Sequence, residues 1–189
     1  MKTIVWDVDD TLNDLMRVWL EDWFLPRNRR VKVSYPDIKA NPPHKILGIT
    51  LAEYLRSYDA FRLSGVYAAM PPDIAIMRWF KKHGQQYRHI ALTAVPLCAA
   101  HESAAWVFRH FGKWIRTFHI VPSPRKGLKV PNYDGRKTDF IRRLDRCDVF
   151  VDDSAMNLAP AARLGVKCVF IPRPWNGAAG TIAEALSSI

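Results

Sequence analysis

The sequence predicts a three-layer α/β fold, in which a parallel β-sheet carries helices on both faces and a small helical cap is inserted after the first strand. From residue 89 onward, short β-branched segments alternate with longer amphipathic ones, which is typical of a parallel sheet covered by helices. Residues 13–72 break this alternation, because they contain helical patterns and a proline-rich connection but no strand pattern. We therefore expect a core domain formed by residues 1–12 and 73–189, and a cap formed by residues 13–72.

The first strand is expected at Thr3–Trp6, where β-branched and aromatic residues form a short apolar run. A helix should follow over residues 12–24, because apolar side chains recur there at spacings of three and four. Pro26 should end this helix, since proline cannot donate the next helical hydrogen bond. Residues 26–48 contain further prolines and a basic cluster, so we expect an irregular connection there.

Two more helices should complete the cap and lead into the core. Thr50 and Glu53 fit a capping box at the start of the first of them, and Gly65 should close it or come soon after its end. After the break at Met70–Asp73, a second helix should run to a stop at Gly84.

The remaining elements alternate regularly between strand and helix. Residues 123–134, with two prolines and one glycine, should form a loop within this series. The expected strands are 89–93, 118–121, 149–152 and 167–171, and the expected helices are 98–111, 138–145, 155–164 and 178–186.

Three carboxylates, Asp7, Asp9 and Asp10, directly follow the first strand. At the carboxyl end of a strand in an open parallel sheet, side chains face the crevice where such folds bind ligands. Acids this close repel one another, so the arrangement is costly unless a cation or a proton-transfer role offsets it. A helix cap at Asp10 or Thr11 would leave the other acids unexplained, and a calcium loop of the EF-hand type would need a glycine and a glutamate that are absent. The pattern therefore indicates a metal or catalytic site.

Residues 7–11, Asp-Val-Asp-Asp-Thr, resemble the first motif of the haloacid dehalogenase superfamily. Members of this superfamily have a Rossmann-like fold and are mostly magnesium-dependent phosphatases, and a helical cap after the first motif selects their substrate. The resemblance implies further matches in a fixed order: a small hydroxyl residue after a second strand, a lysine at the start of a later helix, and acids after another strand. The sequence supplies Thr93, Lys137, Asp152 and Asp153.

The resemblance also implies a role for each matching residue. Asp7 would be the nucleophile that forms an aspartyl-phosphate, and Asp9 would be the general acid and base. Thr93 and Lys137 would bind the phosphoryl oxygens, although a strand-end threonine or a lysine taken singly usually has no such role. The cofactor would be Mg²⁺. Its implied ligands are Asp7, the backbone carbonyl of Asp9, Asp152, and Asp153 either directly or through a water.

These matches predict a Mg²⁺-dependent phosphomonoester hydrolase that acts on a small phosphorylated substrate. Aromatic and guanidinium side chains of the cap favour a nucleoside monophosphate over a sugar phosphate, because rings stack on bases and guanidinium groups bind anions. Lys137-Thr138 and Pro174-Trp175-Asn176 are also similar to the deoxyribonucleotidase-like branch of the superfamily. The cap rings are Trp19, Trp23, Phe24, Tyr54, Tyr58 and Phe61, and the cap cations are Arg27, Arg29, Arg30, Arg56 and Arg62.

The net charge of +10 indicates attraction to anions, either a substrate or nucleic acid. Charge alone gives only salt-sensitive attraction, so nucleic-acid binding is not favoured. Three alternatives stay open: a non-catalytic protein that binds phosphate or nucleic acid on the same fold, a sugar-phosphate phosphatase, and a polynucleotide-end phosphatase. Asp9 argues against the first, because a binder needs no general acid. The basic clusters are Arg27, Arg29, Arg30 and Lys32, and Arg125, Lys126 and Lys129.

The remaining composition excludes several other classes of site. The sequence has no secretory signal and no apolar run long enough to span a bilayer, so we expect a cytoplasmic protein without a membrane partner. Its oligomeric state is open. Three widely separated cysteines, Cys98, Cys147 and Cys168, indicate neither a disulfide framework nor a zinc site. The histidines at 101, 110 and 119 do not share one helical face, and no glycine-rich nucleotide-binding loop is present.

Overall fold

The computed structural model describes residues 1–189 except Lys126, Leu128 and Asn132. Lys126, which belongs to the second basic cluster, thus lies outside the described residues. The described strands form a five-stranded sheet in the order β3-β2-β1-β4-β5, and all the neighbouring pairs are parallel. The strands are β1 (Lys2–Trp6), β2 (Tyr87–Val95), β3 (Ile115–Pro122), β4 (Val149–Asp152) and β5 (Lys167–Phe170).

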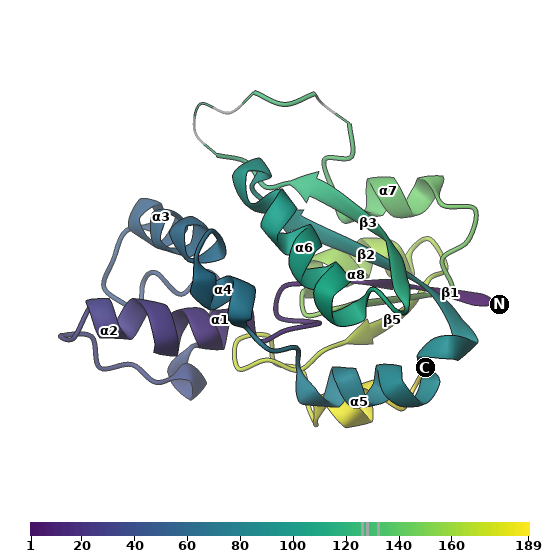
Figure 1. The fold of residues 1–189 in the computed structure, drawn as a ribbon, viewed down its shortest axis with the longest axis horizontal. Coiled ribbons are helices and arrows are strands. Elements are labelled where there is room, and N and C mark those ends of the chain that lie inside the picture. Colours follow the sequence, from purple (N-terminus) through teal and green to yellow (C-terminus); the bar gives the residue numbers. More distant parts are fainter. Residues whose placement is uncertain (126, 128, 132) are drawn as a thin grey trace.

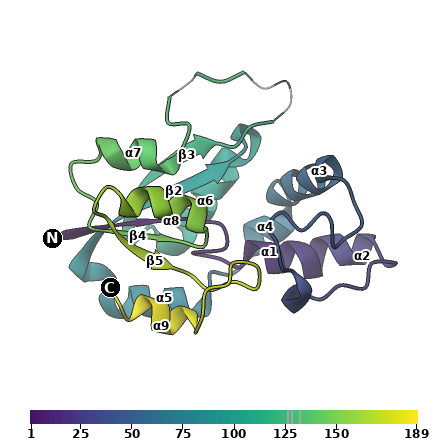
Figure 2. The same cartoon turned by 180° about the vertical axis from the view of Figure 1, so that it is seen from behind.

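Helices cover both faces of this sheet, which confirms the predicted three-layer α/β fold (Figures 1 and 2). Two separate apolar clusters hold the layers together. The first joins one face of the sheet to α5 (Ile74–His83), α6 (Ala100–Phe111) and α9 (Ile182–Leu186). The second joins the other face to α7 (Lys137–Arg143) and α8 (Ala155–Ala162).

The central strand β1 shows why the strand sequences are continuous apolar runs. Ile4 and Trp6 belong to the first cluster and Val5 to the second, and all three side chains are fully buried. A strand buried on both faces has no polar positions to alternate with its apolar ones. The indole of Trp6 donates a hydrogen bond from Nε1 to Nδ1 of His89, at 3.0 Å, so the one polar atom of this ring is satisfied.

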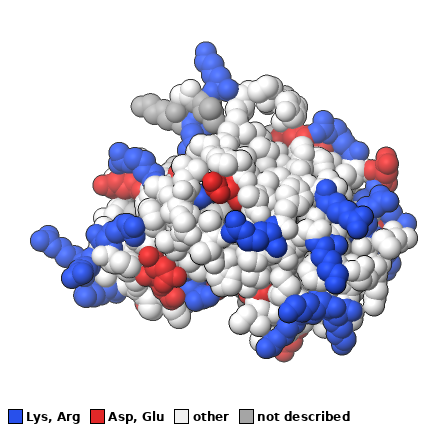
Figure 3. All heavy atoms as spheres, in the orientation of Figure 1, with Lys and Arg blue, Asp and Glu red and all other residues white. Residues whose placement is uncertain are grey.

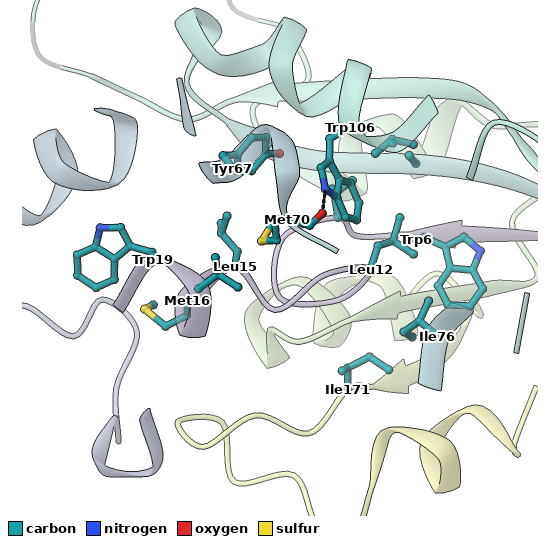
Figure 4. Close-up of a cluster of buried hydrophobic side chains, with 14 of the residues drawn as sticks. Trp6, Leu12, Leu15, Met16, Trp19, Tyr67, Met70, Ile76, Trp106 and Ile171 are labelled. Atoms are coloured by element: carbon teal, nitrogen blue, oxygen red, sulfur yellow. Dashed lines mark hydrogen bonds between the residues drawn. The ribbon is translucent and has the colours of Figure 1, made fainter. Parts of the chain in front are cut away.

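The predicted cap residues form a group of helices beside the sheet, at the left of Figure 1. Their apolar side chains are continuous with the first cluster of the core, as Figure 4 shows for Trp19, Met70 and Ile76. The indole Nε1 of Trp106 on α6 donates a hydrogen bond of 2.7 Å to the Met70 carbonyl at the end of the cap. The elements are α1 (Leu15–Val18), a π-helix (Trp19–Phe24), α2 (Leu25–Arg27), a short 3₁₀ turn (Tyr35–Asp37), α3 (Leu51–Arg62) and α4 (Gly65–Ala69).

The first cap helix differs from its prediction at both ends. It begins at Leu15, because a turn occupies residues 9–12, and it continues past Pro26 to Arg27. The preceding turn is a π-helix, whose wider spacing leaves room for a proline ring that would clash with an ordinary helical turn. Beyond Pro26, the side chains of Arg27 and Asn28 donate hydrogen bonds to carbonyls of the last turn. Proline here is therefore tolerated within the last turn and does not end the helix.

The second cap helix confirms the predicted capping box. Glu53 N donates to the Thr50 hydroxyl at 3.2 Å, and Thr50 N donates to the Glu53 carboxylate at 2.8 Å. The helix ends at Arg62, and Gly65, which was expected to close it or to come soon after, is the first residue of α4. The Ser64 hydroxyl accepts a hydrogen bond from Tyr67 N, so a new helical start is capped at this point.

Several other boundaries differ by a few residues. Strands β2 and β3 extend beyond the predicted runs, because the residues on either side of those runs still pair in the parallel ladder. Helix α9 begins at Ile182, later than the predicted residue 178. Gly180 has a left-handed backbone with φ of 81°, and Thr181 caps the helix that follows, so the preceding residues form a loop.

The two points where the chain leaves and re-enters the core lie side by side. Asp73 N donates a hydrogen bond of 2.9 Å to the Leu12 carbonyl. The buried guanidinium of Arg173, which follows β5, donates to the carbonyls of Asp10 and Asn13 at 2.7 and 2.8 Å. We therefore propose residues 13–72 as the cap, and residues 1–12 with 73–189 as the core.

Lysine and arginine side chains are spread over the surface in Figure 3 and are not gathered into one patch. Arg27, Arg29, Arg30 and Lys32 are exposed at the far end of the cap, around the end of α2. No helix among the described residues is long and apolar enough to cross a membrane.

Candidate active site

The acidic residues predicted from the sequence meet at the carboxyl edge of the sheet. Asp7 directly follows β1, while Asp152 ends β4 and Asp153 follows it. β1 and β4 are neighbours, and β4 returns to β1 on the side opposite β2. This is the topological switch point of the sheet, where open parallel sheets bind their ligands.

Lys137, the first residue of α7, lies between two of these acids. Its Nζ donates to Asp7 Oδ1 at 2.5 Å and to Asp152 Oδ2 at 2.8 Å, and its side chain is 4% exposed. Asp7 Oδ1 also accepts a hydrogen bond from Val8 N at 2.7 Å. The structure thus brings together three of the residues that the sequence singled out.

Residues that the sequence analysis did not assign fix the acids in place. Asn157 of α8 donates to both carboxylate oxygens of Asp152, at 3.1 and 3.0 Å. The indole Nε1 of Trp175 donates to Asp153 Oδ2 at 3.3 Å, and Asn176 donates to the Asp153 carbonyl at 2.8 Å. The short similarity at residues 174–176 was the only sequence signal for this turn, and no signal indicated Asn157.

The donor set fits a divalent cation. Asp7, Asp152 and Asp153 each offer a carboxylate oxygen within 4.8 Å of the others, and they are the only such group within the described part of the chain. Burial raises the pKa of Asp7 to about 8, although Lys137 counteracts this, and burial raises the pKa of Asp153 well above its usual range. A single ammonium does not balance three buried carboxylates, whereas a Mg²⁺ bound by oxygen ligands would. The role of the Asp9 carbonyl as a ligand stays a prediction.

Asp9 faces the cap. Its Oδ2 accepts a hydrogen bond of 2.7 Å from Nη2 of Arg62, at the end of α3, while its Oδ1 has no hydrogen-bond partner among the described residues. Arg62 was one of five cap cations named from the sequence, but nothing in the sequence indicated that it would contact Asp9.

Asp10 has a structural function instead. It adopts a left-handed backbone with φ of 57°, and its buried carboxylate accepts a hydrogen bond of 2.8 Å from Met16 N, in the first turn of α1. Neither of the two residues considered as helix caps is the N-cap, which is Asp14, but Asp10 binds a free N–H group of the first turn. Burial raises its pKa to about 7, although Arg173 nearby counteracts the shift.

Thr93 lies near the end of β2 with its side chain fully buried. Its hydroxyl has no hydrogen-bond partner within the described residues, and it lines the same cavity as Asp7 and Asp9. A buried hydroxyl without a partner costs about 1 to 3 kcal/mol, so a ligand oxygen beside it would be stabilising.

A cavity of about 510 Å³ connects the acidic site to the cap. This volume is within the usual range for sites that bind small molecules. Tyr54, Tyr58 and Arg62 contribute to its cap side, and Trp175 contributes from the core. At its edge, Nε and Nη2 of Arg125 each donate a hydrogen bond of 2.7 Å to Asp59 of α3, which joins the loop after β3 to the cap.

Most of the other aromatic and arginine residues that were named in the cap do not line this cavity. The rings of Trp19, Phe24 and Phe61 are buried in the apolar cluster, and the guanidinium of Arg27 lies 3.7 Å from the ring centroid of Trp23. The residues of the cap set that do not line the cavity are Trp19, Trp23, Phe24, Phe61, Arg27, Arg29, Arg30 and Arg56.

Comparison of the structure with solved structures finds clear similarities. A haloacid dehalogenase-like hydrolase from Streptococcus pneumoniae superposes with a TM-score of 0.60 at 12% identity, covering 99% of this chain and 90% of that one. A predicted phosphoglycolate phosphatase from Haemophilus somnus gives 0.59 at 15% identity, covering 98% and 91%. A HAD-hydrolase from Bacillus subtilis, bound to magnesium, gives 0.57 at 11% identity, covering 90% and 86%.

Comparison of the sequence alone finds no similar protein family or curated protein. The structural similarities, at identities of 11 to 15%, extend over nine-tenths or more of the chain and include both the sheet and the cap. The protein therefore has the fold of the haloacid dehalogenase-like hydrolases, as its four ordered motifs predicted.

Proposed function

We propose that the protein is a Mg²⁺-dependent phosphomonoesterase that acts through an aspartyl-phosphate intermediate. The observation that carries this proposal is the meeting of Asp7, Asp152, Asp153 and Lys137 at the switch point of the sheet, beside a cavity that Asp9 also lines. A hydrolase of this kind needs a nucleophile, neutralisation of the phosphoryl oxygens and a proton for the leaving group. The site has a candidate for each.

In the first step, a carboxylate oxygen of Asp7 attacks phosphorus, and the ester bond to the leaving alcohol breaks. Lys137 holds a positive charge within 2.5 Å of the attacking carboxylate, so it can neutralise a phosphoryl oxygen that arrives there. The hydroxyl of Thr93, which has no partner among the described residues, supplies a second hydrogen bond to the phosphoryl group.

Asp9 donates a proton to the departing oxygen. In the second step it takes a proton from the water that attacks the aspartyl-phosphate, which restores both acids. Its position on the cavity wall, with one carboxylate oxygen unpartnered among the described residues, supports this role.

Asp7, Asp152, Asp153 and the carbonyl of Asp9 would hold the Mg²⁺. When bound, the ion neutralises the phosphoryl oxygens beside the carboxylates. Asn157 and Trp175 orient two of these carboxylates, so the ligand set does not depend on the metal alone for its geometry. The magnesium-bound Bacillus subtilis hydrolase with the same fold supports the choice of ion.

A test of the function uses p-nitrophenyl phosphate. We expect hydrolysis with millimolar Mg²⁺, loss of nearly all activity in excess EDTA, and recovery when Mg²⁺ is restored. Thermal unfolding should be measured in parallel, to show that EDTA leaves the protein folded. A folded, metal-loaded protein that releases no phosphate from this ester or from the substrates below would support the non-catalytic alternative, which a salt-dependent gel shift with nucleic acid would then test.

For the substrate, we propose a small phosphorylated metabolite, with nucleoside monophosphates as the first class to examine. Tyr54, Tyr58 and Trp175 line the cavity and offer rings on which a base could stack. A phosphate-release panel should compare nucleoside 5′- and 3′-monophosphates, sugar phosphates, phosphoglycolate and phosphorylated oligonucleotides at one Mg²⁺ concentration. We expect the highest kcat/KM for a nucleoside monophosphate. A tenfold preference for another class, equivalent to about 1.4 kcal/mol of transition-state discrimination, would refute this choice of substrate and leave the phosphatase assignment intact.

A further inference from the structure

Arg62 is a buried cation with unused hydrogen-bonding capacity. Its side chain is 8% exposed, and its guanidinium carbon lies 4.6 Å from the ring centroid of Tyr58. Nη2 donates to Asp9, but Nε and Nη1 are buried and have no hydrogen-bond partner among the residues described. A guanidinium carries five N–H donors in a planar fork, so most of its capacity is unused in this structure.

This shortage is unusual for a buried arginine. Buried polar groups are nearly always hydrogen-bonded, and exceptions call for an explanation such as a missing ligand. Arg173 provides the comparison within this chain, because all three of its guanidinium nitrogens donate hydrogen bonds. The difference is that Arg62 lines the cavity and Arg173 does not.

The position of Arg62 indicates which part of a substrate it would contact. Lys137, Thr93 and the carboxylate of Asp7 belong to the core and would surround the phosphoryl group, whereas Arg62 comes from the cap. It contacts Asp9, which in the proposed mechanism lies beside the leaving oxygen. An acceptor bound by Arg62 would therefore belong to the leaving group, close to the ester bond.

We propose that Arg62 binds an oxygen of the leaving group close to the ester bond, such as a sugar oxygen of a nucleoside monophosphate, and so makes the enzyme prefer phosphate monoesters that carry such an acceptor over those that carry none. The inference rests on the proposed phosphatase function. Oxygen anions form shorter and stronger hydrogen bonds with guanidinium groups than neutral acceptors do, so a carboxylate is the strongest partner. Nε and Nη1 of Arg62 can bind the acceptor oxygen while Nη2 keeps its contact with Asp9 Oδ2, so Asp9 Oδ1 stays free to face the leaving oxygen.

The test compares two substrates that differ only in the acceptor, propyl phosphate and 3-(phosphonooxy)propanoate. We expect the wild-type kcat/KM to be at least tenfold higher for the carboxylate-bearing ester. Arg62→Met, which keeps the apolar stem and removes the donors, should abolish this preference, mainly by raising KM for the carboxylate-bearing ester. Arg56→Met is the matched control, because Arg56 is an exposed arginine of the same helix that does not line the cavity.

Two further measurements keep the outcomes distinct. Stabilisation of Arg62→Met by inorganic phosphate in a thermal shift assay would show an intact phosphate pocket, and Arg62→Lys serves if the methionine variant does not fold. Equal wild-type activity on both esters, or an equal loss on both in the variant, would overturn the inference alone. If the wild type hydrolyses neither of these esters and no other phosphate monoester, the proposed function is wrong, and the inference fails with it.

Discussion

Replacing Asp7 by asparagine should abolish phosphatase activity and leave the fold intact. The amide has nearly the same shape as the carboxylate, but it is neither a nucleophile for phosphorus nor a good ligand for Mg²⁺. Asp7→Asn also removes one of three buried carboxylates that repel one another, so the metal-free variant should unfold at a temperature no lower than that of the wild type. Phosphate release and thermal unfolding, measured on the same samples, check both parts.

The matched control is Asp145→Asn, which makes the same chemical change at an exposed position outside the cavity. This control should keep wild-type activity. More than a few per cent residual activity in Asp7→Asn, from a sample free of wild-type protein, would show that another group attacks phosphorus.

Replacing Asp9 by asparagine should slow turnover of alkyl phosphates by a factor of about 10² to 10⁴, the usual scale of general acid and base catalysis. The amide oxygen can still accept the hydrogen bond from Arg62, so the contact between the cap and the core is preserved in this variant. KM should change little, because Asp9 acts on protons rather than on substrate binding.

p-Nitrophenyl phosphate separates the two roles of Asp9. Its leaving group departs as a stable anion and needs no proton, so Asp9→Asn should still release p-nitrophenolate in the first turnover. The following hydrolysis of the aspartyl-phosphate still needs a base, and it should be slow. Rapid-mixing kinetics should then show a burst close to one equivalent of enzyme. An unchanged steady-state rate on alkyl phosphates would remove Asp9 from the mechanism.

The central part of the site could be predicted from the sequence because its acids lie at the carboxyl ends of strands, and the apolar runs of the sequence locate those strands. Asp7 follows an apolar run and Asp152 ends another, and in a parallel sheet the carboxyl ends of strands share one edge. The order of the motifs, together with Lys137 at a helix start, was then enough to place these residues at one site.

The contacts of the cap could not be predicted in the same way. The ion pair of Asp9 with Arg62 depends on how α3 packs over the sheet edge, and this follows from side-chain packing between distant segments. The start of the first cap helix was missed for a local reason, because the left-handed backbone of Asp10 extends the turn after β1 by three residues. The π-helix before Pro26 likewise has no sequence pattern of its own.

The hydrogen bond between Leu12 and Asp73 has a consequence for how the sheet assembles. β1 pairs with β2 in a register that places Lys2 beside Tyr87, so a long stretch of chain separates two neighbouring strands. Closing a flexible loop costs conformational entropy that grows with loop length, and contacts between distant residues slow folding. Because the inserted residues begin and end at one hydrogen bond, their folding joins the two ends of this stretch and shortens the loop that remains to be closed. The insertion can therefore change in length without separating β1 from β2.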